Sequence, residues 1–277
     1  MMELLTSQRC FNGEQRRYQH HSVMLNCMMT VSVFLPEKAS DEQRVPVVYW
    51  LSGLTCTDEN FSQKAGAQRI ANELGIALAI PDTSPRGDGI DDVNDYDLGQ
   101  GASFYVNATH PPWDKHYQMY DYIVEELPML IEQFLPVNQR RSICGHSMGG
   151  HGALTIGLRN PHRYQSVSAF SPICNPSSSP WGKKAFTHYL GNDEKQWHQY
   201  DASLLIDSQQ ALLPILIDQG DQDEYLTTQL LPNKLLIQAK QRSALTFRMQ
   251  HGYDHSYFFI ATFIEEHLRY HARFLNT

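Results

Sequence analysis

The pentapeptide Gly145-His146-Ser147-Met148-Gly149 has the glycine spacing of a nucleophile elbow, a sharp strand-to-helix turn that exposes a reactive serine. Small residues are needed two positions before and after the serine because a Cβ there would collide with neighbouring backbone. An apolar run at 141–144 precedes the pentapeptide, and a segment of helical period at 149–160 follows it. These flanks favour a nucleophilic serine over an ordinary glycine turn with a solvated hydroxyl.

A serine hydroxyl becomes a good nucleophile only when a base such as histidine accepts its proton and an acid orients that histidine. Of the 13 histidines in the chain, His251 and His255 lie in the loop between the last apolar run and the last helical segment. His255 stands at the helix entrance, where Ser256 as N-cap would hold it rigidly. We therefore favour His255, with His251 as the alternative. His146 adjoins the serine and is badly placed to turn back on it.

The acid is expected after the preceding strand, where residues 218–224 contain four carboxylates, Asp218, Asp221, Asp223 and Glu224. Asp223 lies far enough past Gly220 to point inward, whereas a run of acids in a loop is usually only solvated. Spacing alone leaves Asp221 open as the alternative to Asp223. With Asp223, the acid follows the serine and precedes His255, which is the chain order of α/β-hydrolases.

The oxygen that gains charge during acyl transfer needs two backbone N–H groups aimed at it. Met148, directly after the serine, offers one at the N-terminus of a helix, where unpaired N–H groups favour an anion. The second is expected from the loop after an early strand. The stretch WLSGLTCTDENF, residues 50–61, fits because Gly53 frees the backbone and Leu54 offers its N–H.

A sheet in which strands alternate with helices would bring these residues together. Short apolar runs occur at 45–51, 75–80, 141–144, 166–170, 212–217 and 244–250, and the clearest helical periods at 119–135, 149–160 and 256–275. This alternation predicts an α/β fold of the α/β-hydrolase kind, with a mostly parallel central sheet and helices on both faces. The alternating residues 30–34 predict an antiparallel N-terminal edge. Loops at the carboxyl ends of parallel strands meet at one edge of the sheet, where we expect the chemistry.

Length and charge narrow the class of protein. At 277 residues we expect one domain, residues 1–277. Lysine and arginine together number 22, and aspartate and glutamate together number 30, which gives a net charge of −8. This charge argues against nucleic acid or an anionic membrane as a partner and favours a small molecule or a protein.

No apolar run approaches the roughly 20 residues of a membrane span, and the N-terminus lacks a signal peptide's apolar centre, so we expect a cytoplasmic protein. The five cysteines form no C-x-x-C pair and are interpreted as reduced thiols.

A series of blocks runs in order from about Tyr49 to the C-terminus: YWLSGLTCTDENF, PDTSPRGD, YDLGQGASFYVNAT, HYQMYDYI, GHSMGGHGAL, AFSPICNP, PWGKKAF, IDQGDQDEYL and GYDHSYFFIATFIEEHLRYH. Through these blocks the chain resembles the S-formylglutathione hydrolases, also called esterase D. The resemblance covers nearly the whole predicted domain. It implies an α/β-hydrolase that cleaves the thioester S-formylglutathione to glutathione and formate, the hydrolytic step of formaldehyde detoxification.

Carried over by position, the resemblance implies Ser147 as the nucleophile, His255 as the base and Asp223 as the acid. Ser147 would attack the formyl carbonyl, and the Leu54 and Met148 amides would hold the oxyanion. Water would then release formate from a formyl-enzyme intermediate. This chemistry requires no metal and no organic cofactor. A homodimer is common in the family.

The formyl group is small, so we expect aromatic side chains to crowd the pocket. Trp181 and either Phe104 or Tyr105 are the candidates, with a plain core position as the alternative for each. Cys56, two residues after the expected oxyanion amide, resembles the family's cysteine beside the active site. Lys64 is a candidate contact for glutathione.

Two residues depart from the pattern of the family, Cys144 and Ser103. Cys144 lies on a predicted buried strand and should change little. Ser103 lies in a loop expected near the pocket, so it bears on the size of acyl group that the pocket accepts.

Two other classes of protein are alternatives. A general short-chain carboxylesterase would use the same triad on oxygen esters, and sequence alone does not separate it from a thioester hydrolase. An inactive binding module with a hydrolase fold would need a degraded triad or elbow, and this chain has neither.

Overall fold

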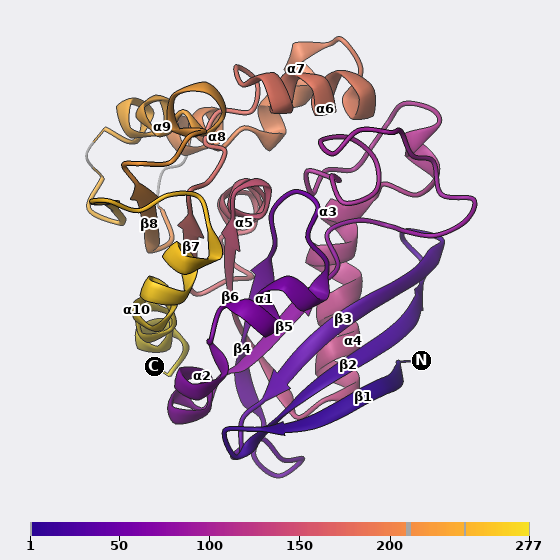
Figure 1. Ribbon diagram of the computed structural model, residues 1–277, viewed down its shortest axis with the longest axis vertical. Helices are drawn as coiled ribbons and strands as arrows, with labels where there is room; N and C mark the ends of the chain where they lie inside the picture. Colours follow the sequence, from indigo (N-terminus) through magenta and orange to yellow (C-terminus); the bar gives the residue numbers. More distant parts are fainter. Residues whose placement is uncertain (1, 209–211, 241, 277) are drawn as a thin grey trace.

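The alternating apolar runs and helical segments fold into one mixed sheet with helices on both of its faces (Figure 1). The computed structural model describes residues 2–208, 212–240 and 242–276. Among these residues the strands are β1 (Glu3–Cys10), β2 (Gly13–Ser22), β3 (Cys27–Leu35), β4 (Val45–Leu51), β5 (Ala77–Pro81), β6 (Val137–His146), β7 (Val167–Phe170), β8 (Ile215–Gly220) and β9 (Leu245–Gln250). Their order across the sheet is β1-β2-β3-β5-β4-β6-β7-β8-β9.

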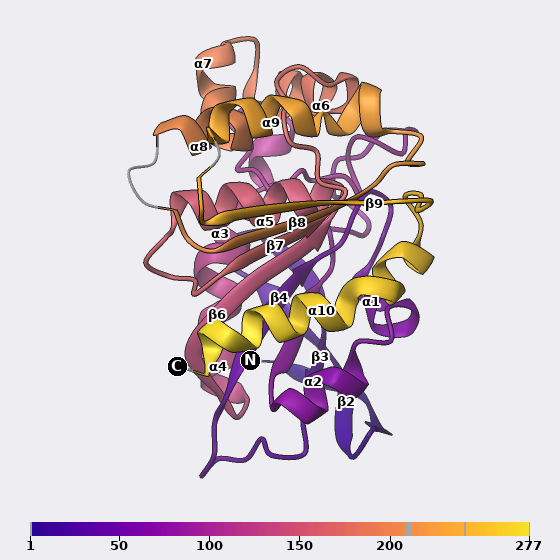
Figure 2. The same ribbon diagram turned by 90° about the vertical axis from the view of Figure 1, so that its left-hand side faces the viewer.

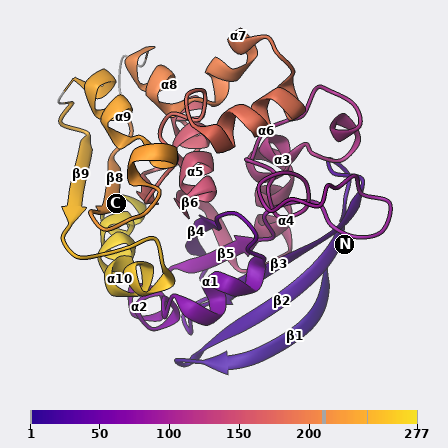
Figure 3. The same cartoon turned by 45° about the horizontal axis from the view of Figure 1, so that its top comes forward.

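The helices connect successive strands and cover the sheet. They are α1 (Asp58–Lys64), α2 (Gln68–Leu74), α3 (Met119–Asp121), α4 (Leu127–Phe134), α5 (Met148–Arg159), α6 (Pro180–Leu190), α7 (Glu194–Trp197), α8 (Ala202–Ser208), α9 (Pro232–Ala239) and α10 (Tyr257–Leu275). A π-helical turn at Tyr122–Glu126 joins α3 to α4, so these three segments cover residues 119–134 of the helix predicted at 119–135. α6 to α9 gather at one end of the molecule, beyond α5 (Figures 1 and 3). None of the helices in the described ranges is both long enough and apolar enough to cross a membrane.

Strand pairing divides the sheet into two parts. β1, β2 and β3 pair antiparallel, and β3 pairs antiparallel with β5. From β5 through β4, β6, β7 and β8 to β9, every pair is parallel. The prediction of a mostly parallel sheet with an antiparallel N-terminal edge is therefore confirmed. The position of β5 between β3 and β4 is not predictable from the apolar runs, because a run does not say which strand it pairs with.

Two apolar layers hold the helices against the sheet. On one face α1, α2 and α10 pack through Phe61, Ile70 and Ile264 against residues such as Trp50 of β4. On the other face the core includes Ile131 of α4 and Leu154 of α5. Figure 2 shows α5 and α10 on opposite sides of β7 and β8. Because both faces are covered, β4 is a nearly continuous apolar run and is almost wholly buried.

β6 is longer than the apolar run that predicts it. The run covers residues 141–144, whereas the strand spans Val137–His146. Residues 138–141 are polar, yet Val137 and Arg141 pair with Val45 and Val47 of β4. Polar side chains at the end of a strand therefore interrupt the apolar pattern without ending the backbone pairing.

A buried carboxylate fixes the helix that follows the loop after β4. Asp58, the first residue of α1, is fully buried and accepts hydrogen bonds from Arg17 at 2.7 and 2.9 Å and from the hydroxyls of Thr30 and Ser32. These contacts tie α1 to β2 and β3. Since residues 52–57 connect β4 to α1, they also limit where that loop can lie.

Asp58→Ala should lower the free energy of unfolding by about 3 kcal/mol, because Arg17 and both hydroxyls lose a buried acceptor. Urea unfolding followed by circular dichroism measures the change. Glu59→Gln, at the adjacent exposed residue, removes only a surface ion pair with Arg17 at 3.4 Å and, as the control, should stay within about 0.5 kcal/mol of wild type. Equal losses from the two variants would contradict this role of Asp58.

Several histidines inside the fold are held in their neutral form. Burial lowers the pKa of His151 to about 4 and that of His271 to about 3. His151 lies in α5, with its Nε2 3.0 Å from the carbonyl oxygen of Phe104. His271 lies in α10 between the hydroxyls of Ser166 and Ser168. Protonation of either ring inside the fold is therefore unfavourable at neutral pH.

The folded protein should lose stability as the pH falls below about 6.5. Histidines of the unfolded chain take up protons near that pH, whereas His151 stays neutral in the fold down to about pH 4. The unfolded state then binds the extra proton, so His151 alone should cost about 3 kcal/mol across this window. His151→Gln should reduce the slope of unfolding free energy against pH by about 1.4 kcal/mol per unit. Exposed His162→Gln is the control, and a wild-type slope in His151→Gln would refute the prediction.

Candidate active site

Ser147 occupies the turn between β6 and α5 in a backbone conformation that is rare for a residue with a side chain. Its φ is 57° and its ψ −118°. The turn needs glycine on either side: a Cβ on Gly145 would lie 2.1 Å from the carbonyl oxygen of Gly149, and a Cβ on Gly149 would lie 1.9 Å from that of Leu51. The structure therefore has the sharp strand-to-helix elbow that the pentapeptide predicts.

A cavity of about 270 Å³ lies over this elbow. Loops that follow β4, β6 and β9 line this cavity. Side chains from α6 and from the segments after β5 and β8 complete its wall. The lining residues are Gly53, Leu54, Thr55, Cys56, Tyr96, His146, Ser147, Trp181, Tyr225, His255, Ser256 and Tyr257. Ser147 and His255 thus share one cavity. No hydrogen bond joins the two side chains within the part of the chain that the structure describes, and such bonds often tighten only when substrate binds.

His255 is fixed by a buried carboxylate. Its Nδ1 lies 2.6 Å from Oδ2 of Asp223, which follows β8 and also accepts hydrogen bonds from Gln219 and from the Tyr225 N–H. Burial disfavours the charged form of Asp223. The pKa of Asp223 nevertheless lies below its ordinary value, because His255 contributes a hydrogen bond and a charge and Ser171 and Tyr225 contribute hydrogen bonds. An ionised Asp223 can therefore orient the imidazole and balance a positive charge on it.

A second Asp–His pair lies close by in the sequence but outside the cavity. His251 Nδ1 lies 2.6 Å from Oδ2 of Asp221, and the His251 side chain is 95% exposed. Asp218 is buried at the end of β8 and forms an ion pair with Arg248 at 2.6 Å. Glu224 is exposed. Of the carboxylates in 218–224, the structure brings Asp223 to the histidine that lines the cavity.

His146 packs beside His255 and adds no charge to it. The two ring centroids are 4.5 Å apart. Burial, together with the neighbouring His255, holds the pKa of His146 well below its ordinary value. A neutral His146 therefore packs against the His255 ring without placing a second charge beside it.

The N–H groups of Leu54 and Met148 are free to bind an anion. Neither donates a hydrogen bond among the described residues. Met148 follows Ser147 directly, and Leu54 follows Gly53, on which a Cβ would lie 3.2 Å from the Cβ of Ser147. The neighbouring loop is held in place, since Thr55 donates its N–H to Gly101. Two backbone N–H groups without a hydrogen-bond acceptor among the described residues thus belong to residues beside Ser147.

The residues predicted for the pocket wall fall into two groups. Trp181 and Cys56 line the cavity. Phe104 and Tyr105, by contrast, are fully buried and do not line it; each has a φ of 51°. Lys64 is exposed at the end of α1, with its Nζ 5.6 Å from the ring centre of Tyr257 rather than in the cavity wall.

Phe104 and Tyr105 are held in the core by specific contacts. The Phe104 ring packs edge-on against Phe186, and the Tyr105 hydroxyl donates to the carbonyl oxygen of Ser52 at 2.9 Å. Ser103, expected near the pocket, is also buried and donates its hydroxyl to the carbonyl of Thr83. These residues therefore support the cavity floor from below.

Three tyrosines of the cavity were not predicted from the sequence: Tyr96, Tyr225 and Tyr257. Tyr225 lies two residues after Asp223, and Tyr257 lies two residues after His255. This short spacing from the two expected catalytic side chains could have predicted that both tyrosines line the cavity. Tyr96 comes from the long segment between β5 and α3, which has no periodic pattern. Nothing in its local sequence points to the cavity.

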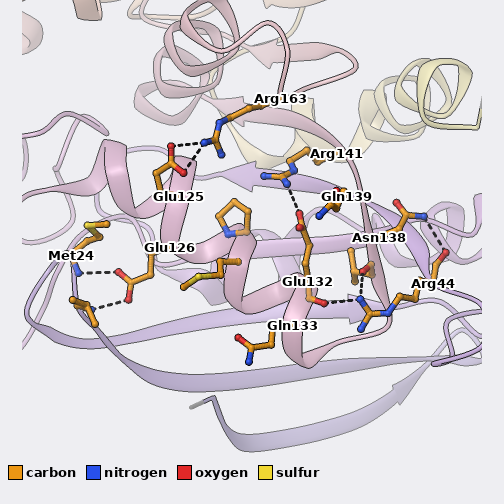
Figure 4. Close-up of a pocket in the computed structure, with 14 residues that line it drawn as sticks. Met24, Arg44, Glu125, Glu126, Glu132, Gln133, Asn138, Gln139, Arg141 and Arg163 are labelled. Carbon is orange, nitrogen blue, oxygen red and sulfur yellow. Dashed lines mark hydrogen bonds and ion pairs between the residues drawn. The ribbon is translucent and has the colours of Figure 1, made fainter.

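A larger cavity, of about 830 Å³, lies elsewhere, between α4, the β2–β3 turn and the start of β6 (Figure 4). Its arginines and glutamates pair with one another, as Arg163 does with Glu125 and Arg141 with Glu132, both at 2.6 Å. Serine, cysteine and histidine are absent from its described lining. Nor does any described part of the chain gather three or more His, Cys, Asp or Glu side chains that could hold a metal ion. The cavity over Ser147 is therefore the candidate active site.

Known proteins match this chain along most of its length. The Esterase family model matches residues 22–270. The S-formylglutathione hydrolase of Rattus norvegicus is 52% identical over 282 residues, which cover 99% of this chain and 100% of the rat protein. A solved S-formylglutathione hydrolase from Agrobacterium tumefaciens is 45% identical, covers 99% of both chains and has a TM-score of 0.96.

A more distant structure shares only the fold. The fluorophosphonate-binding serine hydrolase F of Staphylococcus aureus is 20% identical and has a TM-score of 0.74, covering 94% of this chain and 98% of its own. The predicted fold and family are thus confirmed by structures and sequences that extend over nearly the whole chain. This chain belongs to the S-formylglutathione hydrolase family of esterases.

Proposed function

We propose that this chain is a serine hydrolase that cleaves the thioester S-formylglutathione to glutathione and formate. The observation that carries the proposal is the placement of Ser147 and His255 in one cavity, with the His255 imidazole held by Asp223 at 2.6 Å. The 52% identity to the rat S-formylglutathione hydrolase supports the choice of substrate.

The first half of the reaction transfers the formyl group to Ser147. Asp223 accepts a hydrogen bond from Nδ1–H of His255, which leaves the lone pair on Nε2 to receive the serine proton. The Ser147 oxygen attacks the formyl carbon, and the carbonyl oxygen becomes an oxyanion near the Leu54 and Met148 N–H groups. Asp223, with its lowered pKa, stabilises the imidazolium that results.

The second half releases both products and restores the serine. Collapse of the tetrahedral intermediate breaks the carbon–sulfur bond, and the departing glutathione thiolate takes the proton from His255. Ser147 then holds the formyl group as an ester. His255 next removes a proton from water, whose oxygen attacks the formyl carbon; collapse of the second intermediate releases formate and returns the proton to the serine oxygen.

We also propose that residues 1–277 form one domain that acts in the cytoplasm as a homodimer. One sheet through all the described strands and the family match over 22–270 support a single domain. All five cysteines are unpaired, as is usual in reducing compartments. The proposal of a homodimer rests on the family resemblance. Analytical ultracentrifugation of the full chain measures its oligomeric state.

Matched substitutions in the two Asp–His pairs separate a catalytic role from a structural one. Asp223→Asn should lower kcat about 10⁴-fold, because the amide no longer holds His255 in the reactive tautomer. Asp221→Asn should leave kcat near the wild-type value. His255→Ala should likewise lower kcat strongly, whereas His251→Ala should leave kcat near the wild-type value. Ser147→Ala should abolish turnover without unfolding the protein.

Initial rates of S-formylglutathione hydrolysis measure these effects, with circular dichroism to verify folding. A larger loss from Asp221→Asn than from Asp223→Asn would reverse the assignment of the acid. Appreciable hydrolysis by Ser147→Ala would remove Ser147 as the nucleophile.

The substrate is tested by comparing kcat/KM for S-formylglutathione with kcat/KM for p-nitrophenyl acetate. We expect S-formylglutathione to be favoured by at least about 100-fold, because specificity is set by how well each substrate's transition state is bound. Equal values, or a preference for the oxygen ester, would identify a general short-chain carboxylesterase that uses the same site.

A further inference from the structure

We infer that Tyr96 is a specificity-determining residue that closes the mouth of the active-site cavity, and that Lys184 positions it by clamping the aspartates on either side. This inference rests on the proposed function of the cavity over Ser147. It concerns a segment that lies apart in sequence from the residues of the proposed triad. That segment, residues 91–100, is called the strap below.

Tyr96 reaches the cavity from the strap, which lies beside α6 (Figures 1 and 3). Its hydroxyl accepts a hydrogen bond from Nε1 of Trp181 at 2.9 Å, and the two rings meet edge to face with their centroids 6.3 Å apart. Tyr96 is 56% exposed, whereas Trp181 is 5% exposed. Trp181 therefore forms the inner wall of the cavity, and Tyr96 extends that wall outward to the rim.

The two neighbours of Tyr96 are held by one ammonium group. Lys184 forms ion pairs with both Asp95 and Asp97. Hydrogen bonds to Asp95 and Asp97 raise the pKa of Lys184, so its ammonium group stays charged at neutral pH. Lys184 follows Trp181 by three residues in α6, which places the two side chains on the same side of the helix. A single helix thus holds the strap at Asp95 and Asp97 and at Tyr96 between them.

The ends of the strap are fixed independently of Lys184. At one end the carbonyl oxygen of Asp91 accepts a hydrogen bond from Tyr117, and at the other the Gly99 N–H donates to the hydroxyl of Tyr189. The Asp92 carboxylate accepts from the Gln100 N–H at 2.8 Å and so joins the two ends. The strap is therefore a closed loop whose middle, with Tyr96, is positioned by α6.

This wall continues from Tyr96 to the catalytic centre. The ring centroid of Trp181 lies 4.7 Å from that of Tyr225, which lies 5.0 Å from that of His255. A substrate whose carbonyl sits on Ser147 must fit beside this row of rings in a cavity of only about 270 Å³. The phenol of Tyr96 is the most exposed of these rings, so its removal widens the mouth while the inner wall stays in place.

The acyl-size preference of the enzyme tests the inference. The measured quantity is kcat/KM for p-nitrophenyl butyrate divided by kcat/KM for p-nitrophenyl acetate, which needs no glutathione. Tyr96→Ala should raise this ratio about tenfold, the usual effect of one or two methylene groups in an apolar pocket. Tyr96→Phe keeps the ring and should stay near the wild-type ratio.

Lys184 is tested by the same ratio. Lys184→Gln should raise it in the same direction, mainly through a lower KM for the butyrate ester, because the strap is no longer held against α6. Lys184→Arg keeps both ion pairs and should restore the wild-type ratio. Lys183→Gln, at the adjacent exposed lysine, is the matched control for loss of one charge. High salt should move the wild-type ratio toward that of Lys184→Gln and leave Lys184→Gln itself unchanged.

If Lys184 had a purely structural role, Lys184→Gln would lower the melting temperature without altering the butyrate-to-acetate ratio. That result would overturn the role of Lys184 in positioning Tyr96. An unchanged ratio in folded Tyr96→Ala would overturn the inference as a whole. Failure of the proposed function has a different signature, namely slow hydrolysis of S-formylglutathione by the wild-type protein whatever the ester ratio.

Discussion

The strained backbone at Ser147 is the constraint on which the rest of the site depends. A φ of 57° persists only where the surroundings enforce it, and here Gly149 packs against the backbone of Leu51 at the end of β4. β4 and β6 are parallel neighbours, with Leu51 paired to Gly145. The loop leaving β4 is therefore carried directly over the serine. One pair of strands thus positions both Ser147 and the loop that lies over it.

Burial, rather than distance, distinguishes the two Asp–His pairs. Both have a separation of 2.6 Å between Nδ1 and Oδ2. The pair of Asp221 and His251 lies in water, where the attraction between charges is weak and largely screened. The pair of Asp223 and His255 lies where solvent is mostly excluded, so the same separation produces a stronger field on the imidazole. A short distance alone would not identify which pair faces the serine.

The sequence predicts those parts of the site that strand order determines. Ser147 and His255 follow from the rule that functional loops leave the carboxyl ends of parallel strands, and the elbow follows from its glycines. The choice between Asp221 and Asp223 depends on which side of a short loop turns inward, and spacing carries no such information. Phe104 or Tyr105 was a candidate for the pocket wall with a core position as the alternative, and the structure buries both, because contacts distant in sequence decide which rings reach a cavity. Tyr96 depends on contacts with α6, more than eighty residues away in the chain, that no local pattern encodes.

Two parts of the cavity wall are held by interactions of different strength. On the serine side the loop after β4 is braced by the strand pair and by the buried Asp58. The middle of the strap, in contrast, is held in part by ion pairs of a partly exposed lysine, whose contribution to folding is weakened by solvent. Even a small free energy is nevertheless worth several-fold in a rate ratio, since about 1.4 kcal/mol is tenfold. An interaction that barely affects the stability of the fold can therefore decide which acyl groups reach the serine, and it does so without displacing any group that performs the chemistry.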